Sequence, residues 1–217
     1  MSKPKLLELF AGSKSWGKAA EKLGYEVFST DYKYFDGIDL VKNILDVKKE
    51  DIKFYPDVIC ASPPCEKFSV GSIGVHWNKD HTPKTEDAKH ALTILYKTLE
   101  IFSWFPKAIF YMENPRGKMR KKVTSINRTS VTYCSYGDTR MKPTDIWSNN
   151  IFDMFNLSGW EPRKMCFNGN EKCHHEAAPR GSKTGTQGLK TYYERSIIPK
   201  QLCNEILAQT KTKLKKG

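Results

Sequence analysis

The sequence predicts an α/β fold in which helices cover both faces of a parallel sheet that carries a small loop-rich insertion. Short apolar runs typical of buried strands alternate with segments whose apolar residues recur at helical spacing. A polar or glycine-containing motif follows each apolar run. Residues 150–190 show neither periodicity and are rich in Gly, Pro, Asn, Lys and Arg, so we interpret them as an insertion.

Four apolar runs are predicted as strands, over residues 5–10, 25–30, 57–61 and 108–112. The motifs that follow them are, in order, Ala11-Gly12, Asp31, Ser62-Pro63-Pro64-Cys65 and Glu113-Asn114-Pro115. Two prolines cannot continue a central strand, so the chain leaves the sheet after the third run. Because ligands of parallel sheets bind outside the carboxyl ends of the strands, we expect these motifs to line one site.

Three segments are predicted as helices, over residues 15–23, 85–105 and 197–207. In the first, Trp16, Ala19 and Ala20 share one face, and Gly24 follows at the position of a helix C-cap. In the last, Pro199 falls near the first turn, where its missing N–H costs nothing. Alternation of these helices with the strands favours a parallel sheet.

The composition excludes several classes of protein. A chain of 217 residues is long enough for one domain with a core that needs no disulfide, and its six cysteines are irregularly spaced. No run of 18 apolar residues exists, which excludes a membrane span, and the first ten residues lack the apolar segment of a secretory signal. With a mean hydropathy of −0.59, the chain is expected to be a cytoplasmic monomer without a membrane partner.

The net charge of +12 is distributed unevenly along the chain. Residues 1–110 hold 16 Lys and 15 acids, whereas residues 111–217 carry a surplus of 11 positive charges and all seven arginines. Arginine matches phosphates and guanine edges, so the second half favours a nucleic-acid partner. Net charge that only maintains solubility is the alternative.

Cys65 is a candidate nucleophile because two prolines hold it in a stiff turn at the end of a strand. A stiff turn fixes a reacting group against its substrate at little entropic cost. The alternative is a cysteine that only packs, as free cysteines often do.

Two further motifs suit ligand binding. The carboxyl of Glu113 beside Asn114 suits proton transfer or hydrogen bonding to a polar ligand edge, although Asn-Pro is also a common turn signal. Residues 9–17 follow a strand and open a helix. Asp31 comes 14 residues after Gly17, where nucleotide-binding α/β folds place an acid that accepts ribose hydroxyls.

Taken together, the motifs resemble the DNA cytosine-C5 methyltransferase family. The sequences LFAG (9–12), SPPCEKFS (62–69), MENP (112–115) and YGDTRMK (136–142) occur in the family's order and cover roughly residues 5–147. The short chain, the basic insertion and the Glu-Asn-Pro variant are most similar to small phage or prophage members. The resemblance implies a Rossmann-like sheet that binds S-adenosylmethionine, with double-stranded DNA as the substrate. It also implies that the protein works in the cytoplasm of a bacterial host.

The resemblance also implies a mechanism. Cys65 would attack C6 of a flipped-out cytosine as a thiolate, because cytosine does not accept a methyl group at C5 unassisted. Glu113, from the motif it shares with Asn114, would hold the protonated ring N3. Pro64 would position the base through its backbone carbonyl, and Arg140 would lie near the base O2 and the cysteine. Phosphate contact or a solvated strand face is the alternative for Arg140 and Lys142.

The same resemblance implies a cofactor site and shows departures from the family. The implied cofactor residues are Phe10, Ala11, Gly12, Asp31, Asp46 and Pro63. Asp31 would accept the ribose hydroxyls and Asp46 would meet the adenine amino group, unless Asp46 is a helix cap or a surface acid. Lys14 stands where the family usually has glycine, and Asp138 and Lys142 replace the outer residues of its Gln-x-Arg-x-Arg motif. The late Gly-Asn motif is not recognisable between Tyr193 and Pro199.

Residues 150–190 occupy the place of the family's target-recognition region, between a cofactor-binding and catalytic domain (1–149) and a returning C-terminal helix with a basic tail (191–217). Candidate DNA contacts are Ser69, Lys142, Arg163, Arg180, Lys183 and Gln187. A disordered basic linker is the alternative for residues 178–188. Cys166, Cys173 and His174 offer zinc ligands at an uncommon spacing, so an ordinary loop is expected there rather than a metal site.

Methylation of cytosine in DNA is therefore the leading hypothesis. A catalytically impaired methyltransferase fold that only binds DNA is the alternative, based on Lys14, Asp138 and the missing late motif. The same chemistry on RNA, or with another donor or base position, is a third possibility.

Overall fold

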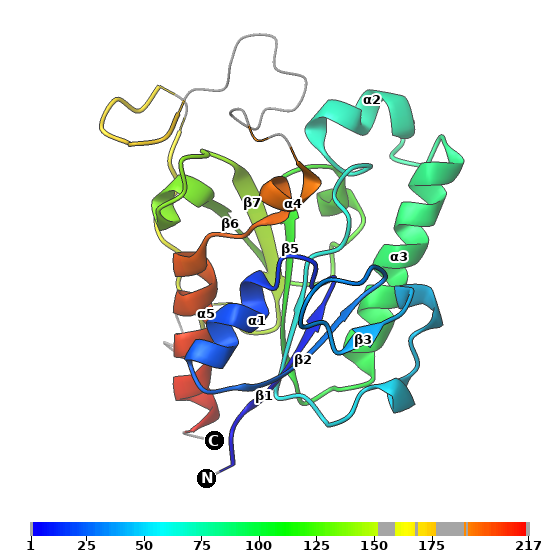
Figure 1. Ribbon diagram of the computed structural model, residues 1–217. Helices are drawn as coiled ribbons and strands as arrows, with labels where there is room; N and C mark the ends of the chain where they lie inside the picture. Colours follow the sequence, from blue (N-terminus) through cyan, green and yellow to red (C-terminus); the bar gives the residue numbers. More distant parts are fainter. Residues whose placement is uncertain (1, 152–158, 168, 177–188, 190, 216–217) are drawn as a thin grey trace.

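The computed structural model describes residues 2–151, 159–167, 169–176, 189 and 191–215. Their centre is a seven-stranded sheet in the order β3-β2-β1-β4-β5-β7-β6 (Figure 1). The strands are β1 (Lys5–Leu9), β2 (Glu26–Asp31), β3 (Leu40–Val41), β4 (Val58–Ala61), β5 (Ile109–Pro115), β6 (Arg128–Thr132) and β7 (Pro143–Ser148). The first five run parallel, whereas β7 lies antiparallel between β5 and β6. The predicted α/β class with a Rossmann-like sheet is confirmed.

The four predicted strands are found as β1, β2, β4 and β5, with one difference that concerns the site. β5 continues through Glu113 and Asn114 to Pro115, because β7 pairs with it over its last five residues. The apolar pattern predicts an end of this strand at Met112 and does not reveal β3, β6 or β7. Strands β6 and β7 have only five and six residues and are largely polar, so alternation of hydropathy does not reveal them.

The helices are α1 (Ser15–Lys22), α2 (Ile73–His76), α3 (Glu86–Ser103), α4 (Tyr192–Ser196) and α5 (Lys200–Leu214). Thr85 caps α3 by accepting a hydrogen bond from the Ala88 N–H. The last helix begins later than predicted, since Pro199 is its N-cap, and it extends to Leu214. Short 3-10 turns lie at Ile44–Asp46 (η1), Lys49–Asp51 (η2), Val70–Ser72 (η3), Lys118–Lys121 (η4) and Tyr133–Tyr136 (η5).

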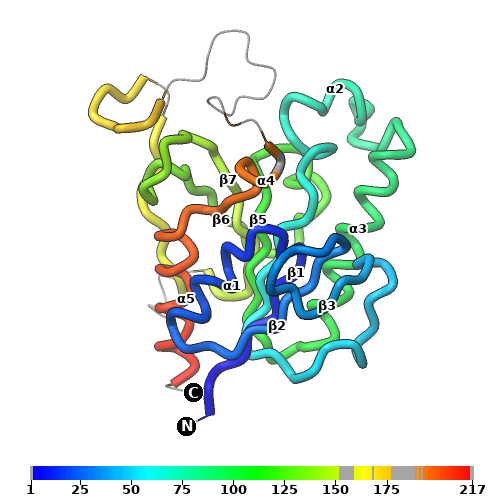
Figure 2. The backbone as a smooth tube through the Cα atoms, in the orientation of Figure 1, coloured from blue at the N-terminus to red at the C-terminus, as the bar shows by residue number. Residues whose placement is uncertain are grey.

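Two apolar cores lie on opposite faces of the sheet. Leu7 and Leu9 of β1 pack into the cluster that includes α3, whereas Leu6 belongs to the cluster of α1 and α5. This division follows from the alternation of side chains along a strand. Helices α1 and α5 lie side by side although their sequences are far apart (Figures 1 and 2). The sheet is thus covered on both faces, and its carboxyl edge is left for the loops.

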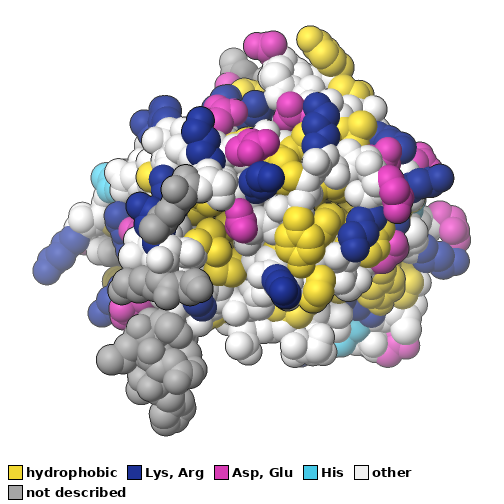
Figure 3. All heavy atoms as spheres, turned by 90° about the horizontal axis from the view of Figure 1, so that it is seen from below, with side chains coloured by type: hydrophobic (Ala, Val, Ile, Leu, Met, Phe, Trp, Pro, Cys, Tyr) yellow, Lys and Arg dark blue, Asp and Glu magenta, His cyan; other side chains and the backbone are white. Residues whose placement is uncertain are grey.

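In the described part of the chain, no helix has the length and apolarity required to cross a bilayer. The face seen from below in Figure 1, near which both termini lie, carries basic and acidic side chains interspersed among apolar ones (Figure 3). The surplus of positive charge in residues 111–217 therefore does not form a basic patch on the visible part of this face.

Candidate functional site

The loops after β1, β2 and β4 meet the end of β5 at the carboxyl edge of the sheet. The Ala11 N–H donates to the Thr30 carbonyl at 3.0 Å and joins the first two loops. The Asn114 side chain donates from Nδ2 to the Pro63 carbonyl at 2.8 Å and joins β5 to the loop that carries Cys65. The motifs singled out in the sequence thus form one continuous hydrogen-bonded edge.

Cys65 lies half-buried in a turn that its own backbone closes. Its carbonyl accepts hydrogen bonds from the N–H groups of Phe68 and Ser69 at 3.0 and 2.9 Å. Phe68 is buried against Trp77 and anchors the turn from below. Burial raises the pKa of the Cys65 thiol, the positive charge of Lys142 opposes this shift, and nearby carboxylates add to it. Lys142 therefore favours the thiolate form.

Gly117 allows the Cys65 loop to approach the segment after β5. A Cβ atom at this position would lie 2.1 Å from the Phe68 carbonyl oxygen. That carbonyl accepts the Lys118 N–H at 2.8 Å, and residues Ser69 and Gly117 form an isolated bridge. Only glycine fits this contact without a backbone shift, so Gly117 is a site-forming residue that the sequence analysis missed.

Glu113 is buried on β5, and its carboxylate has two partners. Tyr133 donates its hydroxyl hydrogen to Glu113 Oε1 at 2.7 Å. The ammonium of Lys142 lies 3.9 Å from the same oxygen and 4.6 Å from the centre of the Tyr133 ring. Lys142 thus lies inside the site, between the Tyr133 ring and the Glu113 carboxylate, rather than on a solvated strand face.

Arg140 is buried and engaged within the protein. Its guanidinium bonds both oxygens of Asp138, at 2.8 and 2.5 Å, and donates to the carbonyls of Arg195 and Ile197. It also lies over the Tyr133 ring, 5.1 Å from its centre. Arg140 is therefore one ring away from Glu113, and it holds the segment before α5 against the site.

At the edge formed by β1 and β2, the chain turns sharply beside a buried acid. Phe10 adopts a left-handed φ of 61°, which turns the chain after β1. Asp31 accepts hydrogen bonds from the N–H groups of Gly12 and Lys33, both at 3.0 Å. Burial raises the pKa of Asp31, and these backbone donors oppose the shift. A Cβ on Gly12 would come within 3.2 Å of the Phe35 ring, so the backbone here packs closely against that side chain.

Lys14 takes the backbone conformation of a glycine. Its φ of 50° is left-handed, at the N-cap of α1. This explains physically why a related chain can have glycine here. The lysine side chain is directed along α1 and reaches Glu21 at 3.3 Å.

Glu8 is a buried acid that the sequence analysis did not single out. It lies on β1 and accepts hydrogen bonds from the N–H groups of Trp16 and Gly17 at the start of α1. Burial raises its pKa to about 8, although these two donors act in the opposite direction. A charged residue within the apolar run KLLELF was the available signal. Through Trp16, whose indole donates to the Ser62 hydroxyl at 3.3 Å, Glu8 is linked to the Cys65 loop.

The remaining candidate residues have varied surroundings. Asp46 is exposed on η1, and the structure provides no contact between it and Asp31. Ser69 shares hydrogen bonds with Ser72 and the Glu66 carbonyl. Arg163 pairs with Glu205 at 2.8 Å, which gives it a partner within the protein. Arg180, Lys183 and Gln187 lie outside the described residues.

Possible metal ligands also lie close together. Cys166 and Cys173 are joined by Cys134 and His175, whereas His174 turns instead toward the Asp138 carbonyl, 3.1 Å from Nε2. The cluster therefore differs from the three possible ligands that the sequence offered: His175 takes the place of His174, and Cys134 comes from a segment more than thirty residues earlier. Spacing along the chain could not reveal that contribution.

Comparison with known proteins gives one relative in sequence and several in fold. No family model matches the chain. The chain is 29% identical over 219 residues to the "Probable DNA (cytosine-5)-methyltransferase" of Frog virus 3 (isolate Goorha), covering 89% of this chain and 96% of the relative. The resemblance stated from the motifs is thereby confirmed.

Two solved structures share the fold. One is a protein encoded in an Escherichia coli prophage and assigned as a DNA modification methyltransferase, with a TM-score of 0.50 and 14% identity over 67% of this chain and 46% of that one. The other is the Entamoeba histolytica methyltransferase EhMeth, with a TM-score of 0.50 and 14% identity over 68% and 53% of the two chains. The matched part of this chain spans about half the length of these two proteins.

Proposed function

We propose that this protein, which resembles the DNA cytosine-C5 methyltransferases in sequence and fold, transfers a methyl group from S-adenosylmethionine to C5 of cytosine in DNA. One observation carries the proposal. Asn114 joins the Cys65 loop to the strand of Glu113, so a thiol and a buried carboxyl are held at one edge. This pair is what covalent activation of a pyrimidine ring requires.

The reaction proposed here balances as follows. The Cys65 thiolate adds to C6, which forms an S–C6 bond and moves the electrons of the C5–C6 double bond to C5. Glu113 shares a proton with ring N3, which limits the charge that builds up on the ring. C5 would then take the methyl group as its bond to the sulfonium sulfur breaks, which leaves S-adenosylhomocysteine. Loss of the C5 proton to a base and expulsion of the Cys65 thiolate restore the double bond. A buried cytosine is unreachable in a duplex, so the base must be flipped out.

Each neighbour of this pair has a proposed part. Lys142 favours the thiolate of Cys65 by its charge. Tyr133 and Lys142 fix the Glu113 carboxylate, and Arg140 positions Tyr133 and the segment before α5. Pro64 and Asn114 keep the loop in place. Arg140 is proposed as a positioning residue, since its guanidinium donors are directed at Asp138 and two carbonyls.

The β1–β2 edge fits the proposed cofactor. S-adenosylmethionine would supply an electrophilic methyl group. Phe10, Ala11, Gly12 and Asp31 would hold it, because a side chain at Gly12 would crowd Asp31 and Phe35, and Asp31 retains lone pairs for ribose hydroxyls. Pro63 and Asp46 would complete its adenosine side. Residues 150–190 would contact the DNA.

The decisive experiment is transfer of labelled methyl groups from S-adenosylmethionine to duplex DNA of mixed sequence. Duplex DNA containing 5-fluorocytosine should trap wild type as a covalent adduct, since fluorine at C5 cannot leave as a proton does. The variant Cys65→Ser should form no adduct, and Cys60→Ser, which removes a buried thiol away from the loop, is the matched control. Label on RNA but not DNA would identify the other nucleic acid.

A protein that binds DNA but has lost catalytic turnover would give a different result in these experiments. If wild type binds duplex DNA tightly but forms neither product nor adduct, the protein is a methyltransferase fold that acts by occupancy. Sequencing of methylated cytosines in DNA from cells that express the protein would identify the target.

A further inference from the structure

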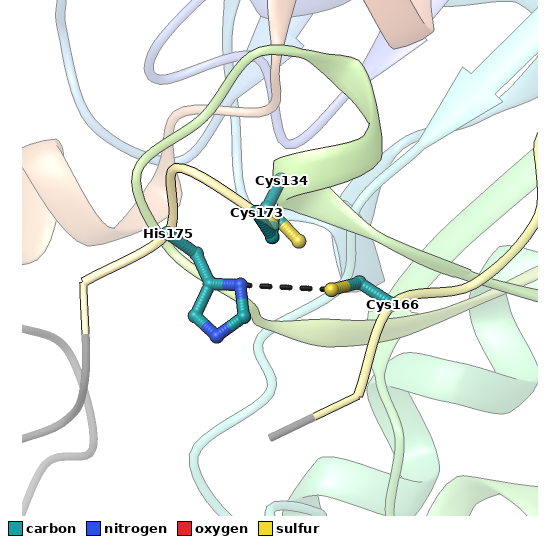
Figure 4. Close-up of side chains that lie close together, drawn as sticks. All are labelled: Cys134, Cys166, Cys173 and His175. Atoms are coloured by element: carbon teal, nitrogen blue, oxygen red, sulfur yellow. Dashed lines mark hydrogen bonds between the residues drawn. The ribbon is translucent and has the colours of Figure 1, made fainter. Parts of the chain in front are cut away.

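Four side chains with metal-binding atoms converge where residues 166–175 cross η5 (Figure 4). They are Cys134, Cys166, Cys173 and His175. Their ligand atoms all lie within 4.8 Å of one another, and Figure 4 shows the side chains facing one another. Three segments of the chain thus contribute to one small cluster outside the site described above.

The spacing fits a tetrahedral ion. Zinc bound by thiolates about 2.3 Å away keeps neighbouring ligand atoms about 3.5–3.8 Å apart. The Cys166 sulfur lies 3.6 Å from Nδ1 of His175. The other pairs lie within the 4.8 Å limit, so small side-chain rotations suffice to complete the shell. We infer that these four residues form a structural zinc site of the Cys₃His type.

The donor set selects zinc among common ions. Thiolate and imidazole ligands suit zinc, whereas calcium and magnesium require oxygen ligands. Four protein ligands close the coordination shell, which is typical of a structural ion rather than a catalytic one. Asn170 donates from Nδ2 to the Cys166 sulfur at 3.2 Å, a contact of the kind that orients a metal-bound thiolate.

The surrounding segment has little apolar burial and is held to the protein mainly by polar contacts. Among its described residues from 161 to 176, none is buried, and Phe167 is 64% exposed. A segment without a core needs cross-links, and a metal ion supplies them at one point. The ion would fasten the loop to η5.

The expected consequence reaches the other site. Cys134 directly follows Tyr133, whose hydroxyl bonds Glu113. Two backbone contacts beside the cluster also attach this segment to the residues around η5. The Cys166 N–H donates to Thr132 Oγ1, and the Glu176 N–H donates to the Thr139 carbonyl. The zinc site would thus fix η5, Cys166 and the chain from Cys173 to Glu176 together.

A disulfide is the competing arrangement. It would use two of the three thiols and leave the third thiol and the imidazole without a role. In the structure all six cysteines are free.

The first test measures metal in the full-length protein, purified without a histidine tag and without chelators. Elemental mass spectrometry should find about one zinc per chain in wild type. Cys173→Ser and His175→Asn should each lower that content at least about tenfold, because each removes one ligand. His174→Asn is the matched control and should retain the ion, since it alters the adjacent imidazole only.

The second test uses wild type alone, so that a variant that fails to fold does not decide the outcome. Zinc should protect Cys166 and Cys173 from alkylation, and a strong chelator should expose them. Cys60 and Cys203, which are buried in the core, are internal references that should stay unreactive with and without the chelator as long as the protein remains folded. Absence of zinc after growth in zinc-supplemented medium, equal alkylation with and without chelator, or a Cys166–Cys173 disulfide found by peptide mapping would overturn the inference. Because these readouts involve neither DNA nor methyl transfer, the result is independent of the proposed reaction.

Discussion

The carboxyl edge of the sheet and residues 159–176 are held in opposite ways. At the edge, Glu113 and Asn114 are buried within β5 and fixed by hydrogen bonds from two other segments. After Trp160, the described residues of the second region are all exposed or half-buried and contact the sheet through polar groups and the proposed zinc ligands. The proposed acid Glu113 is built into the core, whereas the region proposed to meet DNA is attached at a few points. Substitutions in the second region that spare the four proposed zinc ligands should therefore disturb the first region little.

The largest expected effect comes from removing the acid at the edge. Glu113→Gln should lower the rate of methyl transfer about a thousandfold, because the amide cannot give a proton to the ring. Single-turnover rates with saturating DNA would measure this loss. Tyr133→Phe, which retains the carboxyl but removes its hydrogen-bond donor, should lose much less activity. Equal losses in the two variants would contradict the assignment of the acid.

The pH dependence of stability should also reflect the edge. Burial raises the pKa of Glu8 to about 8, from the usual 4.5 expected in the unfolded chain. Between these values the folded protein retains a proton that the unfolded chain has lost, so the free energy of unfolding should fall as the pH rises from about 5 to about 8, by on the order of a few kcal/mol. Urea unfolding at several pH values measures the trend. Glu8→Gln should flatten it; an unchanged slope would exclude Glu8 as the source.

A smaller loss is expected from crowding the Cys65 loop. Gly117→Ala should destabilise the protein by about 2 kcal/mol, because the new Cβ would overlap the Phe68 carbonyl. Urea unfolding at constant pH gives the value. Gly71→Ala is the matched control, since a Cβ there meets nothing within 4 Å. Similar losses at both glycines would mean that the contact relaxes at no cost.

Lys14→Gly should act in the opposite direction. Glycine adopts a φ of 50° without strain, so the variant should gain up to about 1 kcal/mol. Lys18→Gly, within α1, should lose about 1 kcal/mol and serves as the control of opposite sign. The same two proteins, assayed for binding of S-adenosylmethionine, would show whether Lys14 hinders the cofactor.

The smallest effect should come from the attached region. Arg163→Gln removes an ion pair with Glu205 in which the arginine side chain is 46% exposed. Such pairs contribute less than about 1 kcal/mol, so the unfolding midpoint should hardly move. The salt dependence of DNA binding should also be unchanged, since the guanidinium is engaged within the protein. A shallower slope would identify Arg163 as a phosphate contact.

The same contrast explains what could be predicted from the sequence. Short apolar runs revealed β1, β4 and β5, alternation revealed β2, and the motifs at the ends of these strands followed. Strand β7 escaped because it carries Asp145, which is fully buried yet neutralised by Arg120 and Arg128. Hydropathy cannot report a charge whose partners lie elsewhere in the chain. The cluster around Cys166 was only partly visible for the same reason, since Cys134 reaches it through the fold.

Arg140 has a consequence for how the protein is made. Its guanidinium completes its hydrogen bonds only when the carbonyls of Arg195 and Ile197 are present. Next to them, the Ile198 N–H donates to the Ser15 hydroxyl at 3.1 Å. On the ribosome, a nascent chain that has emerged only through β7 already contains Cys65 and Glu113, but it lacks the segment that clamps Arg140 and the helix that covers α1. The proposed site should therefore be completed late in synthesis, after Cys65 and Glu113 themselves have been translated.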